Sequence, residues 1–576
     1  MPSRRSRLAA LALAGAAGYL SYLAFRPFGW WFAAPAAMGL LYLALRRAGL
    51  WRGLASALLF GLGQFLPMLT WALNAAGWLP YLALSLLSAL LLALGGALYR
   101  CARFLCRSSS PSVPDAALFA LSFTAADAFR QFFPYGGFPW GRLGFSQVDG
   151  PMARWAWLGG VPLVGLAAAL AGALAVVALA GLFGRLGAAR GGRAPAGGAG
   201  RPDRRAAGAG AGESGRERAR PRAPGRMRPP GPGPGWRTAA GATGLGLLVV
   251  LGPLAAPVGA GAETGQIRVG AVQGDVAVTD EGLFARQREV LENHVRVSRD
   301  LAAWVAANPG AGPLDIVLWP ENATDIDPRV DQAAYDSIDQ AAAELGAPLL
   351  IGAAQYVNRN NRYNQGLLWR AGLGVVDVYS KRHPAPFAEY MPARSFFRLF
   401  TDKVDLINSD MLAGSEVGLM RFEAVSLGRQ VALGDIICFE VAYDSIVADV
   451  VRAGAELIVV QTNNASFGRS EESTQQLAMT RLRAIEHGRT TVQISTVGVS
   501  GAVAPDGSML TEQTGLFEAA HFVAEVPLRT SITPATRIGE LVCRALMIGP
   551  AGLAVAGLGA RLARSRPSPR APRPRA

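Results

Sequence analysis

Three residues, each placed directly after a short run of mostly apolar residues, could together carry out acyl-transfer chemistry. Glu321 follows the run VLWP, Lys381 follows VVDVYS, and Cys438 follows LGDII. A thiol nucleophile needs a base that takes up and returns its proton. It also needs a cation or hydrogen-bond donors that stabilise the oxyanion of the tetrahedral intermediate. A glutamate, a lysine and a cysteine supply these functions, so the set predicts chemistry through a thioester.

Each of the three residues also has a simpler interpretation. Glu321 could cap a helix or lie on the surface, Lys381 could be a solvated charge at a strand end, and Cys438 could be an inert packing residue. Two observations favour the chemical interpretation. Among 56 Lys and Arg residues only Lys381 and Lys403 are lysines, which indicates a need for a compact, titratable ammonium at position 381. Cys438 lies at a turn from a strand into a helix, where the helix dipole favours the thiolate.

The other candidates for chemistry are weaker. His383 could act as a base, but a structural histidine that fixes the surrounding proline-rich loop is favoured. The remaining cysteines, Cys101, Cys106 and Cys543, lie in or beside apolar segments, and the four thiols form neither a disulfide framework nor a zinc-ligand spacing. We therefore predict no metal site and no cofactor.

The elements that must position these residues include a large membrane region. Hydrophobic residues make up 51% of the 576 residues, which is too apolar for a purely soluble protein of this length. A helix crosses the hydrocarbon core with about 20 residues. Runs near that length predict about eight transmembrane helices, at 8–25, 29–45, 53–72, 79–99, 114–131, 155–183, 237–257 and 541–561. Aromatic residues near the ends of these runs could position the catalytic domain or guide acyl chains, although plain anchoring at the membrane interface is favoured: Trp30, Trp31, Trp71, Phe138 and Trp140.

The formal net charge of +15 comes mainly from arginines at the termini and in one central segment, which indicates a topology signal rather than a nucleic-acid surface. A cytoplasmic N-terminus satisfies the positive-inside rule at every loop except the one with Arg130, Arg142 and Arg154. The membrane region then comprises 1–183, 237–257 and 541–561. Residues 184–236 are predicted to be a disordered cytoplasmic linker, and residues 562–576 a basic cytoplasmic tail.

Residues 264–528 have the composition of a soluble α/β domain, which the span count places outside the cytoplasm. Strands are predicted at 266–273, 315–319, 348–356, 431–438 and 456–462. Helices are predicted between them, at 281–307, 330–345, 445–453 and 474–487. This alternation favours a layered architecture with catalytic groups at strand ends.

The chain order Glu321, Lys381, Cys438 resembles the catalytic triad of the nitrilase superfamily. With the flanking apolar runs, the sequence is similar to the membrane-embedded branch of that superfamily, the apolipoprotein N-acyltransferases. The similarity rests on the segments VQGD, WPE, KRHPAPFAEYMP, CFE, TNNASFG and RLRAIE, and on GFPW and GFSQ in the first half of the chain. It implies an α-helical membrane bundle joined to an α/β domain with the nitrilase-like α-β-β-α sandwich fold.

The resemblance also implies a role for each matched residue. Glu321 would be the general base, Lys381 the cation that stabilises the oxyanion, and Cys438 the nucleophile. Glu389 matches the family's second essential glutamate and would orient the lysine and the thiol. The other residues implied to support the substrate pocket are Phe439, Glu440 and Asn464. The family more commonly has tyrosine, aspartate and tryptophan at the positions of Phe439, Asn464 and Ser466.

The implied reaction is the last step of bacterial lipoprotein maturation. An acyl chain passes from a membrane phospholipid, through a thioester, to the N-terminal amine of the diacylglyceryl-cysteine of an apolipoprotein. The resemblance implies a multi-pass monomer in the bacterial cytoplasmic (inner) membrane, with its catalytic domain on the extracytoplasmic side and no nucleic-acid partner. One alternative is a membrane-tethered nitrilase-type amidase that hydrolyses a small amide. Another is a non-catalytic membrane scaffold, although a scaffold would be expected to have lost part of the triad.

Overall fold

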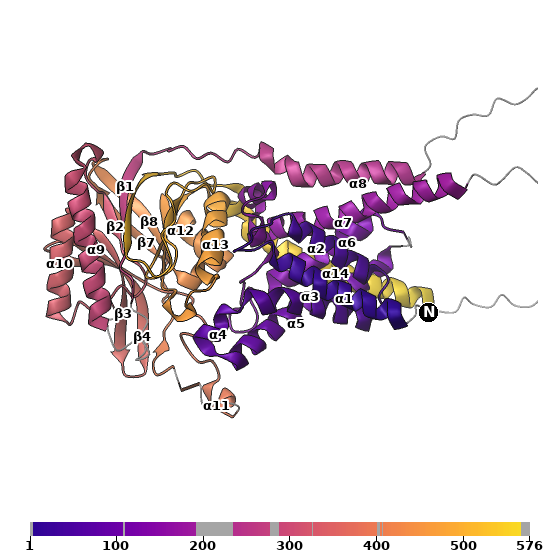
Figure 1. The fold of residues 1–576 in the computed structure, drawn as a ribbon, viewed down its shortest axis with the longest axis horizontal. Coiled ribbons are helices and arrows are strands. Elements are labelled where there is room, and N and C mark those ends of the chain that lie inside the picture. Colours follow the sequence, from indigo (N-terminus) through magenta and orange to yellow (C-terminus); the bar gives the residue numbers. More distant parts are fainter. Residues whose placement is uncertain are drawn as a thin grey trace, which may run out of the picture.

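The structure, a computed structural model, describes residues 4–106, 110–191, 234–276, 287–324, 326–399, 404–405 and 407–565. A bundle of helices and a layered α/β domain lie end to end along the longest axis of the molecule (Figure 1). Most of the predicted linker at 184–236 and most of the predicted tail at 562–576 lie outside the described residues.

Each of the eight predicted apolar runs coincides with a helix of the bundle. These helices are α1 (Arg4–Tyr22), α2 (Ala33–Arg46), α3 (Leu50–Met68), α5 (Trp78–Ala102), α6 (Val113–Phe129), α7 (Trp155–Gly191), α8 (Pro234–Leu251) and α14 (Pro534–Ser565). Within the described chain, four helical segments are long and apolar enough to cross a membrane: Trp78–Leu105, Pro151–Phe183, Arg237–Ala255 and Pro534–Ser565. Membrane-spanning helices are thus supported, and the number of eight spans stays a prediction.

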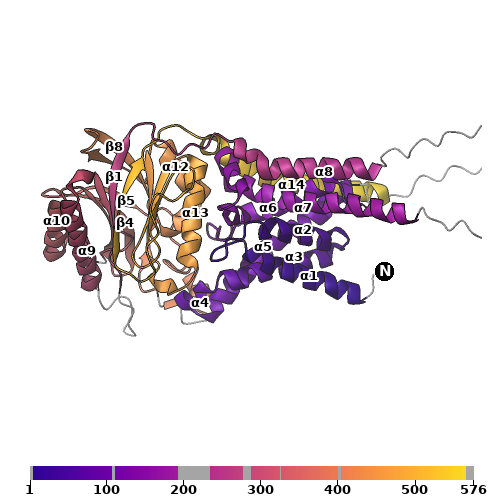
Figure 2. The same cartoon turned by 45° about the horizontal axis from the view of Figure 1, so that its top comes forward.

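The bundle has one end against the α/β domain and one end away from it. The N-terminal end of α1, the end of α7, the start of α8 and the end of α14 all lie at the far end (Figures 1 and 2). The connections at the end that faces the α/β domain contain the short helices α4 (Trp71–Ala76), η2 (Leu143–Gln147) and η3 (Pro151–Arg154). The chain therefore enters and leaves the α/β domain from the same end of the bundle.

Two β-sheets form the centre of the α/β domain. The strand order is β12-β1-β2-β3-β4-β5 in the first sheet, with β6 beside β4, and β11-β10-β9-β8-β7 in the second. The strands are β1 (Gln266–Gln273), β2 (Ile316–Leu318), β3 (Leu349–Asn358), β4 (Asn361–Arg370), β5 (Gly374–Ser380), β6 (Asp410–Met411), β7 (Leu419–Ala424), β8 (Arg429–Ile437), β9 (Leu457–Thr462), β10 (Thr490–Ser495), β11 (Gly501–Val503) and β12 (Ala520–Pro527). The pairs β1–β2, β2–β3, β8–β9 and β9–β10 are parallel.

Helices cover the outer face of each sheet, which confirms the predicted α-β-β-α sandwich. Helices α9 (Gln287–Ala307) and α10 (Gln332–Leu345) cover the first sheet, while α12 (Asp444–Arg452) and α13 (Glu472–His487) cover the second and face the bundle (Figure 2). Buried side chains such as Leu318 and Val459 meet between the sheets. Apolar residues of α12 and α13 join those of the bundle in one hydrophobic core. The second sheet is thus anchored to the membrane region through these two helices.

Several antiparallel strands were not predicted from the sequence. The strand β4, which pairs with both β3 and β5, is absent from the prediction, and β5 is predicted only as the strand end before Lys381. In β5, Val376 and Val378 are exposed and Asp377 lies between them, so the strand has no continuous buried face. The predicted helix at 281–307 begins at Gln287 in the described chain.

Candidate active site

The structure brings the three predicted reacting residues together at the ends of three strands. Glu321 lies in the turn after β2, Lys381 directly follows β5, and Cys438 directly follows β8. The first two strands belong to one sheet and the third to the other, so the site lies where the two sheets meet. Cys438 has a φ of 54°, a left-handed conformation that is rare for a residue with a Cβ. Such local strain is typical of functional turns.

Lys381 is completely buried between two carboxylates. Its Nζ donates to Oε1 of Glu389 at 2.6 Å and to Oε1 of Glu321 at 3.3 Å. Burial alone would lower the pKa of Lys381, but Glu321, Glu389 and Cys438 outweigh it and hold that pKa well above its usual value. The backbone N–H of Ala385 donates to the other oxygen of Glu389 at 2.7 Å. Glu389 therefore fixes a permanently charged ammonium inside the site.

Glu321 is held by donors on both of its oxygens. Nδ2 of Asn364 donates to Oε1 at 2.6 Å, and the backbone N–H of Asn463 donates to Oε2 at 2.8 Å. Burial raises the pKa of Glu321, the charge of Lys381 lowers it, and Glu389 raises it again, with a net upward shift. A carboxylate with a raised pKa is a better base, because it accepts a proton more readily. This arrangement fits the role that the resemblance implies for Glu321.

The surroundings of Cys438 favour the thiol over the thiolate, opposite to the effect expected from a helix dipole. Burial raises the pKa of Cys438 well above its usual value, and the charge of Glu321 raises it further, while Lys381 only partly opposes them. The helix-dipole argument failed because α12 begins at Asp444, and Cys438 instead opens the short helical turn η7 (Cys438–Ala442). The nucleophile must therefore lose its proton during the attack, which makes the neighbouring base necessary.

Glu440 joins the turn of the nucleophile to the turn of the lysine. Its carboxylate accepts hydrogen bonds from the hydroxyl of Tyr379 at 2.9 Å and from the backbone N–H groups of Arg382 at 2.7 Å, His383 at 3.0 Å and Ile437 at 2.9 Å. Every one of these donors belongs to the end of β5, the loop after it or the end of β8. Glu440 thus ties together the turns that carry two reacting residues.

His383 has the environment of a structural histidine. Its ring centroid lies 4.0 Å from that of Tyr443, and Gly136 of the bundle is packed against it. Burial lowers the pKa of His383 to about 4, so the ring is neutral. These contacts favour the structural interpretation over a role as base.

Aromatic residues of the bundle pack against the turn of the nucleophile. The ring of Phe439 stacks on Phe138 with centroids 5.6 Å apart and on Trp140 at 6.1 Å. Trp71 contacts Phe467 at 5.0 Å. Trp71 and Trp140 are buried in this cluster, which favours the alternative that they position the catalytic domain. The bundle supplies one wall beside the nucleophile.

Buried ion pairs fix the α/β domain to the loop between α6 and α7. Nη1 of Arg142 lies 2.8 Å from Oδ1 of Asp444, and Nη1 of Arg483 lies 2.9 Å from the same oxygen. In the same loop, Arg130 pairs with Asp127 at 3.1 Å. Two of the arginines that depart from the positive-inside pattern thus have buried acidic partners.

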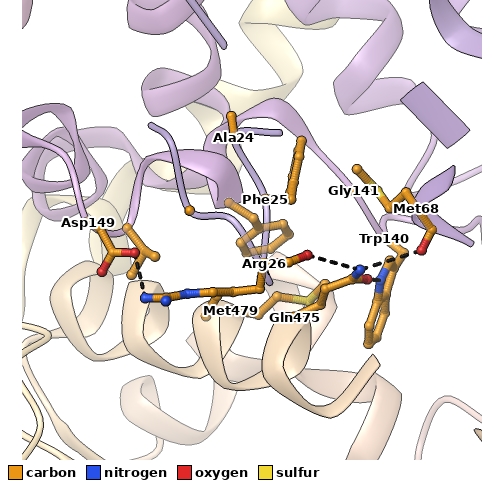
Figure 3. A pocket seen from close by; sticks show the side chains of 13 residues that line it. Ala24, Phe25, Arg26, Met68, Trp140, Gly141, Asp149, Gln475 and Met479 are labelled. Atoms are coloured by element: carbon orange, nitrogen blue, oxygen red, sulfur yellow. Dashed lines mark hydrogen bonds and ion pairs between the residues drawn. The ribbon is translucent and has the colours of Figure 1, made fainter. Parts of the chain in front are cut away.

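A small pocket lies where the first loop of the bundle meets α13 (Figure 3). Gln475 reaches across it: its Oε1 accepts from Nε1 of Trp140 at 2.7 Å, and its Nε2 points to the carbonyl oxygens of Arg26 at 3.4 Å and Met68 at 3.5 Å. The residues that line the pocket include none of Glu321, Lys381 and Cys438. We therefore assign the pocket to the interface between the helix bundle and the α/β domain.

Several polar residues of the site were not predicted. Asn364 on β4 holds Glu321, and Gln476 on α13 donates to the sulfur of Cys438 at 3.8 Å. Asn464, which was predicted, binds Glu472 rather than a reacting residue. Among the described residues, no group of three or more His, Cys, Asp and Glu side chains could hold a metal ion. The absence of a cofactor stays a prediction.

The fold is that of the carbon-nitrogen hydrolase class, and the family description "Carbon-nitrogen hydrolase" matches residues 268–533. The description "Apolipoprotein N-acyltransferase N-terminal domain" matches residues 17–174. The apolipoprotein N-acyltransferase of Mycolicibacterium smegmatis is 32% identical over 560 residues, covering 95% of this chain and 85% of that protein. That of Azotobacter vinelandii is 32% identical over 583 residues, covering 98% and 96%. The chain belongs to the apolipoprotein N-acyltransferase family.

Among solved structures, an amidase from Nesterenkonia sp. is 18% identical, with a TM-score of 0.33, covering 47% of this chain and 93% of the amidase. The two family matches and the similarity to full-length relatives make this chain a bacterial membrane acyltransferase. The amidase alternative is less well supported, because relatives such as these match nearly the whole chain, bundle included.

Proposed function

We propose that this enzyme transfers an acyl chain from a phospholipid, through a thioester on Cys438, to the N-terminal amine of a diacylated apolipoprotein. The observation that carries the proposal is the buried Lys381, which bridges Glu321 and Glu389 at the strand ends that also present Cys438. This arrangement supplies a base, a nucleophile and a fixed cation in one enclosed site. The names of the relatives support the lipoprotein acceptor.

In the first half-reaction, the sulfur of Cys438 attacks the carbonyl carbon of a phospholipid acyl ester while Glu321 takes the thiol proton. Lys381 stabilises the oxyanion that develops on the carbonyl oxygen. As the intermediate collapses, the ester C–O bond breaks and the alkoxide of the lysophospholipid takes the proton from Glu321. The enzyme keeps the acyl group as a thioester, and Glu321 is again a carboxylate.

In the second half-reaction, the amine of the apolipoprotein attacks the thioester carbon. Glu321 takes a proton from the attacking nitrogen, and Lys381 again holds the oxyanion. The C–S bond then breaks, its electron pair goes to sulfur, and the proton on Glu321 returns to form the thiol. The thioester keeps the acyl carbon reactive toward the amine. The overall exchange of an ester for an amide is favourable because the amide is the more stable product.

The placement of the bundle supports access from the membrane. We infer eight spans, with the far end of the bundle on the cytoplasmic side and residues 264–528 on the extracytoplasmic side of the inner membrane. This topology is supported by the N-terminal end of α1 and the end of α14, which both lie at the end of the bundle away from the α/β domain (Figure 1). Both proposed substrates carry lipid chains, so a site adjoining the end of the bundle can receive them from the bilayer. We take the monomer as the working unit.

Intact-mass spectrometry tests the first half-reaction. The purified full-length protein is incubated with a phospholipid of defined acyl chains, beside the variants Cys438→Ala and Cys106→Ala. The parent and Cys106→Ala are expected to gain the mass of one acyl group, and Cys438→Ala is expected to gain none. Cys106 is a suitable control because it is a half-buried thiol far from the site in sequence. An adduct that persists in Cys438→Ala would contradict the assignment of the nucleophile.

A further inference from the structure

Gln476, on the first half of α13, presents its amide to the sulfur of the nucleophile. Its Nε2 lies 3.8 Å from Sγ of Cys438, within the range of a hydrogen bond to sulfur. The side chain is completely buried, so water does not compete for this donor. We infer that Gln476 is a further catalytic residue, which donates a hydrogen bond to the sulfur of Cys438 whenever that sulfur carries negative charge.

The direction of the amide follows from its other contacts. Oε1 of Gln476 accepts from Oγ1 of Thr462 at 2.9 Å and from Nδ2 of Asn464 at 3.0 Å. If the amide were turned over, its NH₂ group would face the NH₂ group of Asn464, and both would be donors. The observed orientation is therefore the one that satisfies the network, and it leaves the NH₂ group of Gln476 for the sulfur.

The orientation of Asn464 is fixed in turn by groups on its far side. The backbone N–H of Gly498 donates to Oγ of Ser495 at 2.7 Å, and that hydroxyl donates to Oδ1 of Asn464 at 2.5 Å. Nδ2 of Asn464 also donates to Oε2 of Glu472 at 2.6 Å. A chain of hydrogen bonds thus runs from a backbone donor, which cannot reverse, to the sulfur of Cys438. Asn464, which the resemblance implies to support the substrate pocket, thereby holds Gln476 in this orientation.

A donor at this place has a defined part in the proposed reaction, on which the inference rests. Negative charge develops on sulfur twice: when the thiol proton leaves during the first attack, and when the C–S bond breaks during transfer to the amine. The carboxylates of Glu321, Glu389 and Glu472 all oppose that charge, and Lys381 favours it. Gln476 adds a neutral donor that stabilises the thiolate without adding a charge to the buried site.

The rate of alkylation by iodoacetamide tests the inference without any lipid substrate. Iodoacetamide reacts with the thiolate, so the rate at Cys438, followed by peptide mass between pH 6 and 10, reports the fraction ionised. Loss of a hydrogen bond to a charged group is expected to slow alkylation at neutral pH about tenfold in Gln476→Leu. In Gln476→Glu, which keeps the shape and places a carboxylate oxygen toward the sulfur, a larger decrease is expected.

Gln475→Leu is the matched control, because the neighbouring residue on the same helix points to Trp140 and the bundle. It is expected to keep the alkylation profile of the parent. If Gln476→Leu does not fold, as judged by thermal unfolding and gel filtration, Gln476→Glu decides. A parent-like profile in the folded Gln476 variants would overturn the role of Gln476. A parent that alkylates normally but gains no acyl group from phospholipid would count against the proposed function alone.

Discussion

The substitution Lys381→Met removes the only cation that faces Glu321 and Glu389 within hydrogen-bond distance in the described structure. The lysine side chain is completely buried, and its Nζ bonds to the two carboxylates at 3.3 Å and 2.6 Å. Removal of one partner from a buried ion pair typically costs about 3–5 kcal/mol, because the remaining charge is left uncompensated. We therefore expect the midpoint of thermal unfolding to fall by roughly 5–10 °C at pH 8.

The pH dependence of this loss separates an electrostatic effect from simple packing. Without the lysine, the pKa of Glu321 rises further above its value in the unfolded chain. A group with a raised folded pKa destabilises the fold increasingly as the pH rises above its unfolded pKa. The difference between Lys381→Met and the parent should therefore shrink from pH 8 to pH 5. Adding Glu389→Gln to Lys381→Met should recover part of the stability at pH 8.

Activity is expected to respond differently from stability. Loss of an oxyanion-stabilising group typically lowers the rate by about 10²–10³-fold, and the added Glu389→Gln change does not restore it. Differential scanning fluorimetry in detergent and the rate of acyl-adduct formation by intact mass measure the two effects. The reasoning fails if Lys381→Met unfolds within 2 °C of the parent at pH 8, or if it forms the adduct at the parent rate.

Three further substitutions test the surroundings of the site. Both oxygens of the buried Asp435 lack a partner within the described chain, and burial holds its pKa well above the usual value. By the same linkage, Asp435→Asn should raise the thermal midpoint at pH 8 and leave it unchanged at pH 4. Glu440→Ala should lower the acylation rate about 100-fold or more, with Glu440→Gln intermediate, as followed by intact mass. Gly352→Ala would place a methyl group 2.3 Å from the carbonyl oxygen of Pro320, the residue before Glu321, and should therefore lower both activity and thermal stability. In the control Gly310→Ala, no atom lies within 4 Å of the added methyl group, so neither activity nor stability should change.

The sequence allowed Glu321 and Cys438 to be located because each follows a recognisable strand, whereas Lys381 stands out as one of only two lysines. Buried parallel strands such as β2 and β9 are continuous apolar runs, and the residues after them lie at one edge of the sheet. The order of Glu321, Lys381 and Cys438 then matched a known pattern of chemistry. The contacts between these residues and Glu389 depend on sheet order, which a single sequence does not specify.

The shift in the pKa of Cys438 and the role of Gln476 could be inferred only from the tertiary structure. From the sequence alone, a thiol between a strand and a helix is expected to be acidified by the helix dipole. The burial around Cys438 and the start of α12 at Asp444 are known only from the structure. The sequence of α13 opens with polar residues, among them Glu472, Gln475 and Gln476, and the structure buries all three although apolar residues of the same helix join the core. Polar residues that are buried on every face of a helix usually bind one another or a site. Such a pattern could have directed attention to Gln476.

The second half-reaction tests the central claim most directly. The acyl-enzyme is isolated after incubation with phospholipid, freed of donor, and mixed with a diacylated lipopeptide that has a free N-terminal amine, or with the same peptide acetylated at that amine. We predict that the free peptide gains the acyl group as an amide while the enzyme loses the same mass, and that the acetylated peptide gains nothing. Release of the acyl group only as a free fatty acid, at the same rate with either peptide, would contradict the account and indicate a hydrolase.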